Sequence, residues 1–247
     1  SVAAIVKANQ IMNLVIIVLS MASTAVTVIL SQYLGAQDEK NASRTCMVSI
    51  VLIGSVSLAA TILVFAGHTP LYRAIHVPEE VFDEASLYLL IVGAFILVQG
   101  LYLTFSAMIR AFAMVKEVMI ISVIMNAMNI VGNAILINGW FGMPQLGAVG
   151  AAISTDISKL VGLTLMIGMF FKSRRVKMGM SYLRPFPVQI LKNLCLLAIP
   201  TGVESFSYNL SQMIILGIVN SFGTLVTVTK GYCTIFANID YVYAMAI

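Results

Sequence analysis

Charged residues are scarce in this chain. Asp, Glu, Lys and Arg make up 10% of its 247 residues, whereas soluble domains contain about 25%. A water-soluble fold needs a charged exterior, so the composition excludes a soluble enzyme, a nucleic-acid-binding domain and a disordered regulator. Apolar residues supply 60% of the chain, and its mean hydropathy is +0.99. The composition therefore predicts an all-α polytopic membrane protein, a bundle of helices that crosses the bilayer several times.

Histidine and cysteine are also rare, with two and three copies. His68 and His76 lie in one predicted loop, which excludes a His-Glu-x-x-His zinc site, and no Walker-type phosphate loop is present. Cys46, Cys195 and Cys233 each fall within an apolar run, and we interpret them as packing residues rather than a disulfide framework. The sequence thus carries no signature of an enzyme, a metal centre or ATP-driven transport.

Seven apolar segments are long enough to cross a bilayer, which takes about 20 residues in a helix. They are rich in Leu, Ile, Met and Ala and lack the alternation of membrane strands, so each is predicted to be a helix. Their expected ranges are 9–34, 45–66, 85–109, 117–138, 147–171, 191–219 and 224–247.

Basic residues predict the orientation of these segments. Ten of the 14 Lys and Arg residues lie in or beside the loops that follow the first, third and fifth segments. That side is expected to be cytoplasmic, because cytoplasmic loops are enriched in Lys and Arg. The first segment then enters from outside. Together with a start at Ser1 and an end at Ile247 inside an apolar run, this predicts a fragment of a longer protein.

Polar side chains recur every three or four residues in four of the segments, so they share one face of each helix. Hydrogen bonding between helices and a shared wet cavity are the two interpretations. We favour hydrogen bonding for the Ser/Thr stripe. The cavity fits three asparagines on one face better, since each amide uses up to about four partners. The stripes comprise Ser20, Thr24, Thr27 and Ser31; Gln99, Tyr102, Ser106 and Arg110; Ser122, Asn126, Asn129 and Asn133; and Thr201, Glu204, Tyr208 and Ser211.

Ionisable residues within the predicted spans are candidates for chemistry. Asp156 and Lys159 lie one helical turn apart, and we expect them to neutralise each other. Glu204 lies mid-span, four residues after Pro200, with no basic residue within a turn. A proline removes a backbone hydrogen-bond donor from the helix. An isolated carboxyl group in a low-dielectric environment can exchange a proton or hold a cation. Glu204 is therefore the leading candidate, and Asp240, also mid-span, is the second.

Several short segments, taken in order, resemble those of one family. They are Ala8-Asn9-Gln10-Ile11, Ser31 to Ala36, Asn126 to Asn133, Gly147 to Thr155 and Ala198 to Glu204. Their order and spacing resemble the multidrug and toxic compound extrusion (MATE) transporters. The resemblance implies two six-helix lobes around a central cavity, with this chain supplying helices two to eight. It also implies most of the first lobe over 1–171, a basic inter-lobe linker over 172–190 and the start of the second lobe over 191–247.

The resemblance implies an activity as well. Such a protein exports amphipathic, often cationic drugs in exchange for Na⁺ or H⁺, with no other cofactor. Asn133 stands where some members of the family carry an acidic residue. Glu204 and Asp240 are therefore the candidate carboxyl groups for ion coupling in this chain. By motif position, the first-lobe coupling residues would be Tyr88, Asn129, Asn133 and Thr155. The polar stripes supply the expected substrate contacts, Gln99, Tyr102, Asn126, Thr201 and Tyr208.

Two alternatives stay open. A lipid-linked saccharide flippase of the same superfamily would need several cationic residues for a pyrophosphate, and the stripes supply mainly Arg110. A non-transporting membrane sensor or an intramembrane hydrolase belongs to another class, and the absence of catalytic pairs counts against the hydrolase. For the transporter, we expect a monomer in the inner (plasma) membrane whose partners are lipid and a drug-like molecule, with no nucleic acid.

Overall fold

The computed structural model describes residues 2–74, 82–139, 142, 145–220, 229–231, 233–234 and 237. Every regular element within these residues is a helix, which confirms the predicted all-α class. The helices are α1 (Val2–Gly35), α2 (Glu39–Ala74), α3 (Phe82–Ala94), α4 (Ile96–Ala111), α5 (Val115–Asn138), α6 (Gly147–Ser173), the 3-10 helix η3 (Met180–Leu183) and α7 (Val188–Asn220).

The predicted segment 85–109 is not one helix, so that prediction was wrong. α3 ends at Ala94, α4 begins at Ile96, and Phe95 lies between them with φ −97° and ψ 7°. The Phe95 N–H donates to the carbonyl of Val92 at 3.2 Å, and the α-helical pattern resumes where the Gln99 N–H donates to the Phe95 carbonyl at 2.9 Å. The sequence stays apolar through the interruption, so hydropathy could not reveal it.

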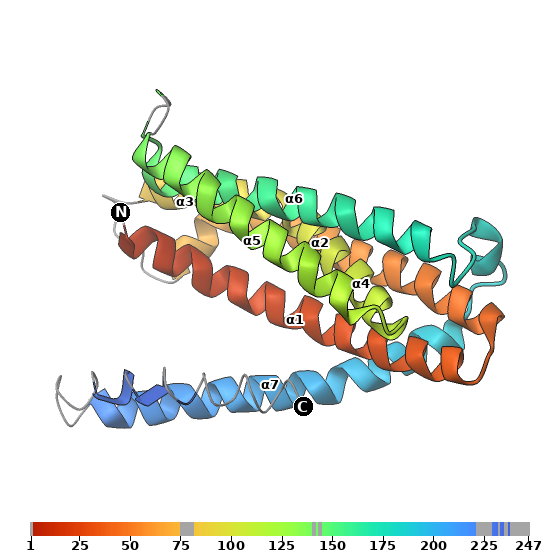
Figure 1. Ribbon diagram of the computed structural model, residues 1–247. Coiled ribbons are helices and arrows are strands. Elements are labelled where there is room, and N and C mark those ends of the chain that lie inside the picture. The colour runs from red at the N-terminus through yellow and green to blue at the C-terminus, as the bar shows by residue number, and fades with distance from the viewer. Residues whose placement is uncertain are drawn as a thin grey trace. The chain divides into compact units, whose positions relative to one another are not determined.

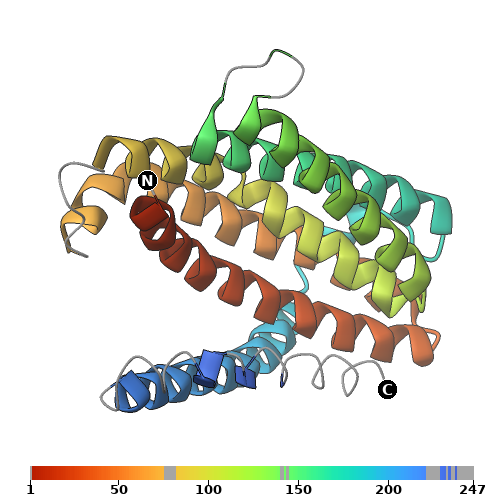
Figure 2. The same cartoon turned by 60° about the vertical axis from the view of Figure 1, so that its left-hand side comes forward.

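The chain forms two compact units, Ser1–Ile199 and Pro200–Ile247. In the first unit α5 lies along α6, and α4 packs against α1, α2 and α6 (Figures 1 and 2). Most of the residues from Tyr102 to Ile109 in α4 are buried. Phe170 of α6 packs against Phe105 and Phe112 of α4, with ring centroids 5.3 and 5.5 Å apart. α4 is therefore central to the core of the first unit.

Two hydrogen bonds join α1 to α4. The hydroxyls of Ser23 and Thr27 donate to backbone carbonyls of α4 at 2.7 and 3.3 Å. Among the described residues, Thr27 is the one member of the predicted Ser/Thr stripe that makes such a link, so the interhelical interpretation is wrong for the other three. A hydroxyl in a helix can reach the carbonyl three or four residues back and then needs no neighbouring helix. The residues that bond within α1 in this way are Ser20, Thr24 and Ser31.

Several helices carry the length and apolar surface of membrane spans. Large side chains on their outer faces are exposed, including Leu63 at 71%, Ile130 at 69% and Val123 at 61%. Such faces suit lipid, and they identify a multi-pass membrane protein. Among the described residues, four helices are long and apolar enough to cross a membrane: Met12–Gly35, Glu39–Gly67, Val115–Ile137 and Val149–Ser173.

The other predicted spans are not among these four helices. Ile96–Ala111 is a shorter apolar helix, because the interruption at Phe95 divides its span. The predicted segment 191–219 corresponds to α7, which is not among the four. The segment 224–247 lies almost entirely outside the described residues.

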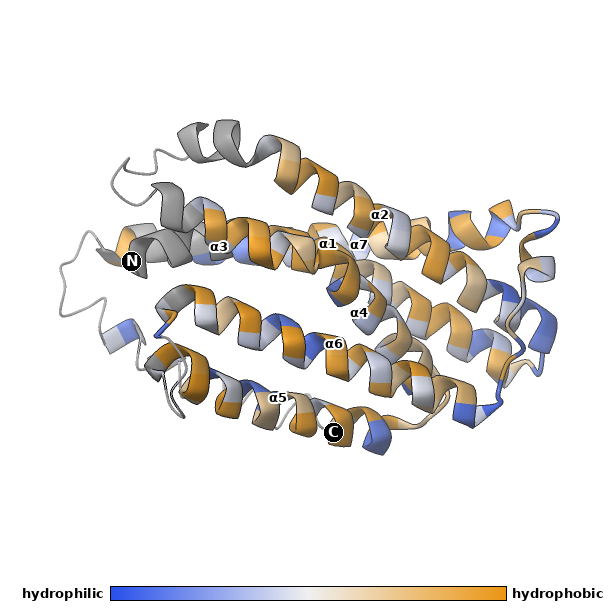
Figure 3. Cartoon of the chain, turned by 90° about the horizontal axis from the view of Figure 1, so that it is seen from above, coloured by the Kyte–Doolittle hydropathy of each residue, from blue (hydrophilic) through white to orange (hydrophobic). Residues whose placement is uncertain are grey.

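The predicted cytoplasmic loops lie together. The connections after α1, α4 and α6 share one end of the first unit, and hydrophilic residues gather there (Figures 1 and 3). The backbone N–H of Lys177 donates to the hydroxyl of Ser43 at 3.2 Å, and η3 packs against α2. Ile190 and Leu194, in the first turns of α7, are buried in the core of the first unit. The basic segment 172–190 is thus packed at this end.

Candidate functional site

The polar stripe of α5 meets α6 inside their spans. The side-chain amide of Asn129 donates to the hydroxyl of Thr155 at 3.0 Å, and the amide of Asn133 donates to Oδ1 of Asn129 at 3.2 Å. The Thr155 hydroxyl donates onward to the carbonyl of Ala151 at 2.9 Å. All three side chains are partly buried. The structure therefore brings three of the predicted coupling residues into one chain of hydrogen bonds, which we call the α5–α6 network.

Small residues let α5 and α6 approach closely enough for these bonds. A Cβ atom at Gly132 would collide with the side chain of Ser154, and one at Gly150 would lie 2.6 Å from the carbonyl oxygen of Leu136. The Ser154 hydroxyl also donates to the backbone carbonyl of Asn129 at 3.1 Å. The sequence interpretation missed Ser154 as a site residue, because its place beside Thr155 in a run of small residues resembled packing alone.

One acceptor of the network lacks a donor. Oδ1 of Asn133 is buried and accepts no hydrogen bond from the described residues. A buried polar atom left unpaired is unfavourable by about 1–3 kcal/mol, so this oxygen is a candidate ligand for a cation or a water molecule. Hard cations prefer oxygen ligands of this kind. The residues of the network contain no carboxylate, however, so they offer oxygen atoms without a balancing negative charge.

The other predicted residues of the first unit lie outside the network. Tyr102 is 8% exposed, and its hydroxyl shares a 3.2 Å hydrogen bond with that of Ser122 on α5. Gln99 is partly buried on α4, and Asn126 is exposed on α5. The side chain of Tyr88 lies outside those that the structure describes.

Asp156 directly follows Thr155 on α6. It is 1% exposed, and neither carboxylate oxygen has a hydrogen-bond partner among the described residues. No hydrogen bond joins Asp156 to Lys159 among the described residues, and their mutual neutralisation stays a prediction. Spacing of three residues permits such a contact but does not enforce it: Asp156 is fully buried, while Lys159 is only partly buried on the next turn.

The second unit has a polar cavity of its own. Its volume is about 680 Å³, and Glu204 and Tyr208 line it one turn apart on α7. Thr201 is partly buried one turn earlier, and α7 continues through Pro200. Asp240 lies outside the described residues. The other lining residues are Ser205, Asn209, Gln212, Thr234 and Ala237.

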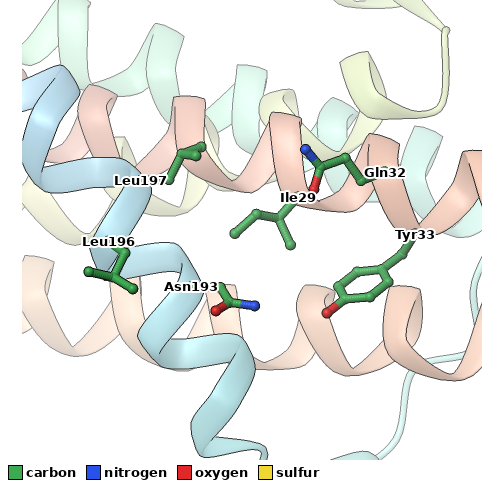
Figure 4. A pocket seen from close by; sticks show the side chains of 6 residues that line it. All are labelled: Ile29, Gln32, Tyr33, Asn193, Leu196 and Leu197. Atoms are coloured by element: carbon green, nitrogen blue, oxygen red, sulfur yellow. The ribbon is translucent and has the colours of Figure 1, made fainter.

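A smaller cavity of about 340 Å³ lies in the first unit, between the end of α1 and the start of α7. Figure 4 shows the side chains of Tyr33 and Asn193 pointing toward one another across it. The sequence did not indicate this cavity, because its two walls are about 160 residues apart in the chain and meet only through folding. The remaining lining residues are Ile29, Gln32, Leu196 and Leu197.

Comparisons with known proteins agree with this architecture. The family model MatE matches residues 1–135. The "Uncharacterized transporter YisQ" of Bacillus subtilis is 37% identical over 94% of this chain and 51% of its own length. The "Probable multidrug resistance protein NorM" of Thermotoga maritima is 26% identical over 81% of this chain and 43% of its own. A crystal structure of MATE in the straight conformation has a TM-score of 0.81 at 20% identity, covering 90% of this chain and 49% of that one.

The apolar helices identify a multi-pass membrane protein, and the match to the MatE family model places it among transporters rather than enzymes. The chain belongs to the MATE family. It spans about half the length of the curated relatives it matches.

Proposed function

We propose that the full-length protein is a secondary active antiporter that exports amphipathic, often cationic compounds in exchange for Na⁺ or H⁺. Membership of the MATE family and the multidrug resistance names of several relatives support export. The observation that carries the coupling is the unpaired, buried Oδ1 of Asn133, at the end of a hydrogen-bonded chain through Asn129 to Thr155.

Cation binding would act on the packing of α5 against α6. A cation at Oδ1 of Asn133 would order the asparagine side chains and stabilise the helix arrangement in which Asn129 reaches Thr155. An exported compound that prefers the other arrangement would then be bound and released in alternation with the cation. Coupling of this kind requires each ligand to prefer one of two states, and it is reciprocal.

The second unit offers the carboxyl that the α5–α6 network lacks. Glu204 lines a cavity together with Tyr208, so it would neutralise a bound cation or a positively charged compound there. We assign coupling to Glu204, Asp240, Asn129, Asn133, Tyr88 and Thr155, and substrate contacts to Gln99, Tyr102, Asn126, Thr201 and Tyr208. We further propose a monomer in the inner membrane that needs lipid, no nucleic acid and no cofactor beyond the coupling cation.

The test uses the full-length protein in sealed lipid vesicles. Efflux of a fluorescent cationic dye is measured under a Na⁺ gradient and, separately, under a pH gradient. We expect one gradient to drive efflux, and Glu204→Gln and Asn133→Leu to reduce it at least tenfold. Thr164→Val is the control, since Thr164 is exposed on α6 and its hydroxyl donates to the carbonyl of Leu160, one turn back in the same helix. Efflux that is independent of both gradients would refute the antiporter, and unchanged efflux in both variants would refute the assigned residues.

A further inference from the structure

We propose that Asp156 is a proton-binding site of the first unit, and that its proton occupancy controls the junction between α3 and α4. The inference deepens the proposed function, on which it rests for its link to transport, by adding a proton site in the first unit that is separate from the α5–α6 network and from Glu204. Asp156 is the one charged residue that is buried among the described residues.

The first observation is the isolation of the carboxylate. Asp156 is 1% exposed, and both of its oxygens are buried without a hydrogen-bond partner among the described residues. A buried, unpaired charge is costly in a folded protein and is neutralised or acquires donors. The ionised Asp156 carboxylate therefore lacks a hydrogen-bond donor within the described part of the chain, and binding one proton would remove its negative charge.

The second observation is the position of Asp156 along the bundle. Gly162 of α6 faces the ring of Tyr102 on α4, whose Cε2 atom would lie 3.3 Å from a Cβ at that glycine. α4 and α6 run in the same direction (Figure 1). Counting six residues back from this contact along each helix gives Asp156 on α6 and Ile96 on α4, so these two residues lie at the same height along the bundle. Ile96 is the first residue of α4, directly after the interruption at Phe95.

The face of α6 supports the same placement. Asp156, Leu163 and Phe170 are spaced by seven residues, which places them along one stripe of a helix, and all three are buried. Phe170 packs against Phe105 and Phe112 of α4. The stripe that carries Asp156 therefore faces α4. Within this stripe, Asp156 is the residue at the level of the interruption at Phe95.

The third observation is the set of donors at the interruption. The first amides of a helix have no carbonyl one turn back within it, and in α4 these belong to Ile96, Leu97 and Val98. Phe95 supplies no side-chain cap. Such N–H groups form an attractive environment for a negative charge. Ionised Asp156 would draw the start of α4 toward itself, whereas the protonated acid would release it and let α3 and α4 realign.

A proton fits this position better than Na⁺. One carboxyl oxygen is enough to bind a proton, whereas Na⁺ needs several oxygen ligands. The charge of Lys159, one turn away on the same helix, opposes both cations and does not distinguish them.

The other titratable groups on the helices packed against α6 lie at other heights along the bundle than Asp156. On α4, Tyr102 is bonded to Ser122, and Arg110 is exposed four turns beyond Ile96. On α5, Lys116 and Glu117 lie at its start, between three and four turns from Asn129, which is level with Thr155. On α3, Asp83, Glu84 and Tyr88 precede Ile96 by two to four turns, and their side chains lie outside those described.

The test labels the full-length protein in lipid nanodiscs with dicyclohexylcarbodiimide, which reacts with protonated carboxyl groups in apolar surroundings, and maps adducts by mass spectrometry. We expect an adduct on Asp156 whose yield falls as the pH rises, and the same adduct in the control variant Glu117→Gln. A pH-independent yield, or no adduct at Asp156 while another carboxyl is labelled, would overturn the proposal. Protection by Na⁺ at constant pH would also overturn it, because it would indicate a metal-ion site.

Amide hydrogen exchange tests the junction. The peptide containing Ile96 to Val98 is expected to change its exchange rate with pH relative to a peptide of α1, and Asp156→Asn is expected to abolish that change. An unaltered pH dependence in Asp156→Asn would contradict control of the junction. If this variant does not fold, the pH dependence of exchange at Ile96 to Val98 in the unmodified protein still tests the junction, since a rate that does not depend on pH would contradict its control. Neither measurement needs transport, so failure of efflux refutes the proposed function alone, and failure of labelling refutes this site alone.

Discussion

The amide of Asn129 on α5 donates to the hydroxyl of Thr155 on α6 at 3.0 Å, across 26 residues of sequence. The bond joins two apolar helices at a point where glycines bring their backbones close together. Its neighbour Asn133 keeps an unpaired buried oxygen. A neutral oxygen-rich site in α5 and α6 and a separate carboxyl in the second unit are the features on which cation coupling would depend.

Replacing Thr155 tests the bond between α5 and α6. Thr155→Val keeps the shape of the side chain but leaves the Asn129 amide without its acceptor, which we expect to lower the free energy of unfolding by about 1–3 kcal/mol. It should also raise the cation concentration needed for half-maximal efflux. Thermal unfolding in detergent and vesicle efflux measure the two effects. The control Thr164→Val should change stability by less than about 0.5 kcal/mol, and equal effects in the two variants would contradict the role of Thr155.

The hydroxyl pair of Tyr102 and Ser122 should link α4 to α5. We expect Tyr102→Phe and Ser122→Ala each to destabilise the protein, and the double variant to show a coupling energy of about 0.5–1.5 kcal/mol. Chemical unfolding of the four proteins in detergent gives that energy. Tyr182→Phe, in η3 outside the spans, serves as the control. Strictly additive effects would show that the two hydroxyls do not interact.

Gly150 and Gly168 form a matched pair on α6. A Cβ at Gly150 would lie 2.6 Å from the carbonyl oxygen of Leu136, a backbone atom, whereas one at Gly168 would meet nothing within 4 Å. Gly150→Ala should therefore separate α5 from α6 and cost about 1–3 kcal/mol of stability, as overpacking does. Gly168→Ala should be neutral or should stabilise the helix by up to about 1 kcal/mol, because alanine has the higher helix propensity. The measurement is the thermal midpoint of each variant, and the idea fails if Gly150→Ala is as stable as Gly168→Ala.

Asp38 should make stability depend on pH at the start of α2. Its Oδ1 accepts the backbone N–H of Asn41 at 3.1 Å, and its Oδ2 accepts the Asn41 side-chain amide at 2.7 Å. These hydrogen bonds, the backbone one first, hold the pKa of Asp38 below its ordinary value of 3.8. A carboxyl whose pKa is lowered by folding stabilises the protein above that ordinary value, and its contribution is lost as the pH falls through the folded-state value.

We therefore expect Asp38→Asn to lower the thermal midpoint at neutral pH and to weaken its decline in acid. Thermal melts of the full-length protein between about pH 7 and pH 3 provide the measurement. Glu39→Gln, at the neighbouring position, is the control for removing one carboxylate. If both variants keep the acid dependence of the unmodified protein, Asp38 is not its source.

The α5–α6 network shows how far sequence reasoning reached. Spacing of three and four residues placed Asn129 and Asn133 on one face of a helix, and resemblance to the family added Thr155. The hydrogen bonds agree with a shared face, but the bond from Asn129 to Thr155 is of the interhelical kind, the alternative to the wet cavity that we favoured for the asparagines. Ser154 was missed, because its role depends on the backbone carbonyl of Asn129 lying opposite, which only the packing of α5 and α6 arranges. The burial of Asp156 without a hydrogen-bond partner among the described residues was not predicted either, because spacing along α6 does not show which side chains of the neighbouring helices meet it.

Composition and segment length were enough to predict the class of fold. Runs of apolar residues longer than a bilayer is thick must satisfy their backbone hydrogen bonds internally, so helices and membrane location follow from them. Packing between helices set three features that hydropathy does not encode: the interruption at Phe95, the burial of Asp156 and the cavity between Tyr33 and Asn193. These depend on which side chains meet across helices, and contacts between distant parts of a chain leave no periodic signal within one segment. The scarcity of charged residues thus indicated a membrane protein, and the packing of the helices determined that Asp156 is buried.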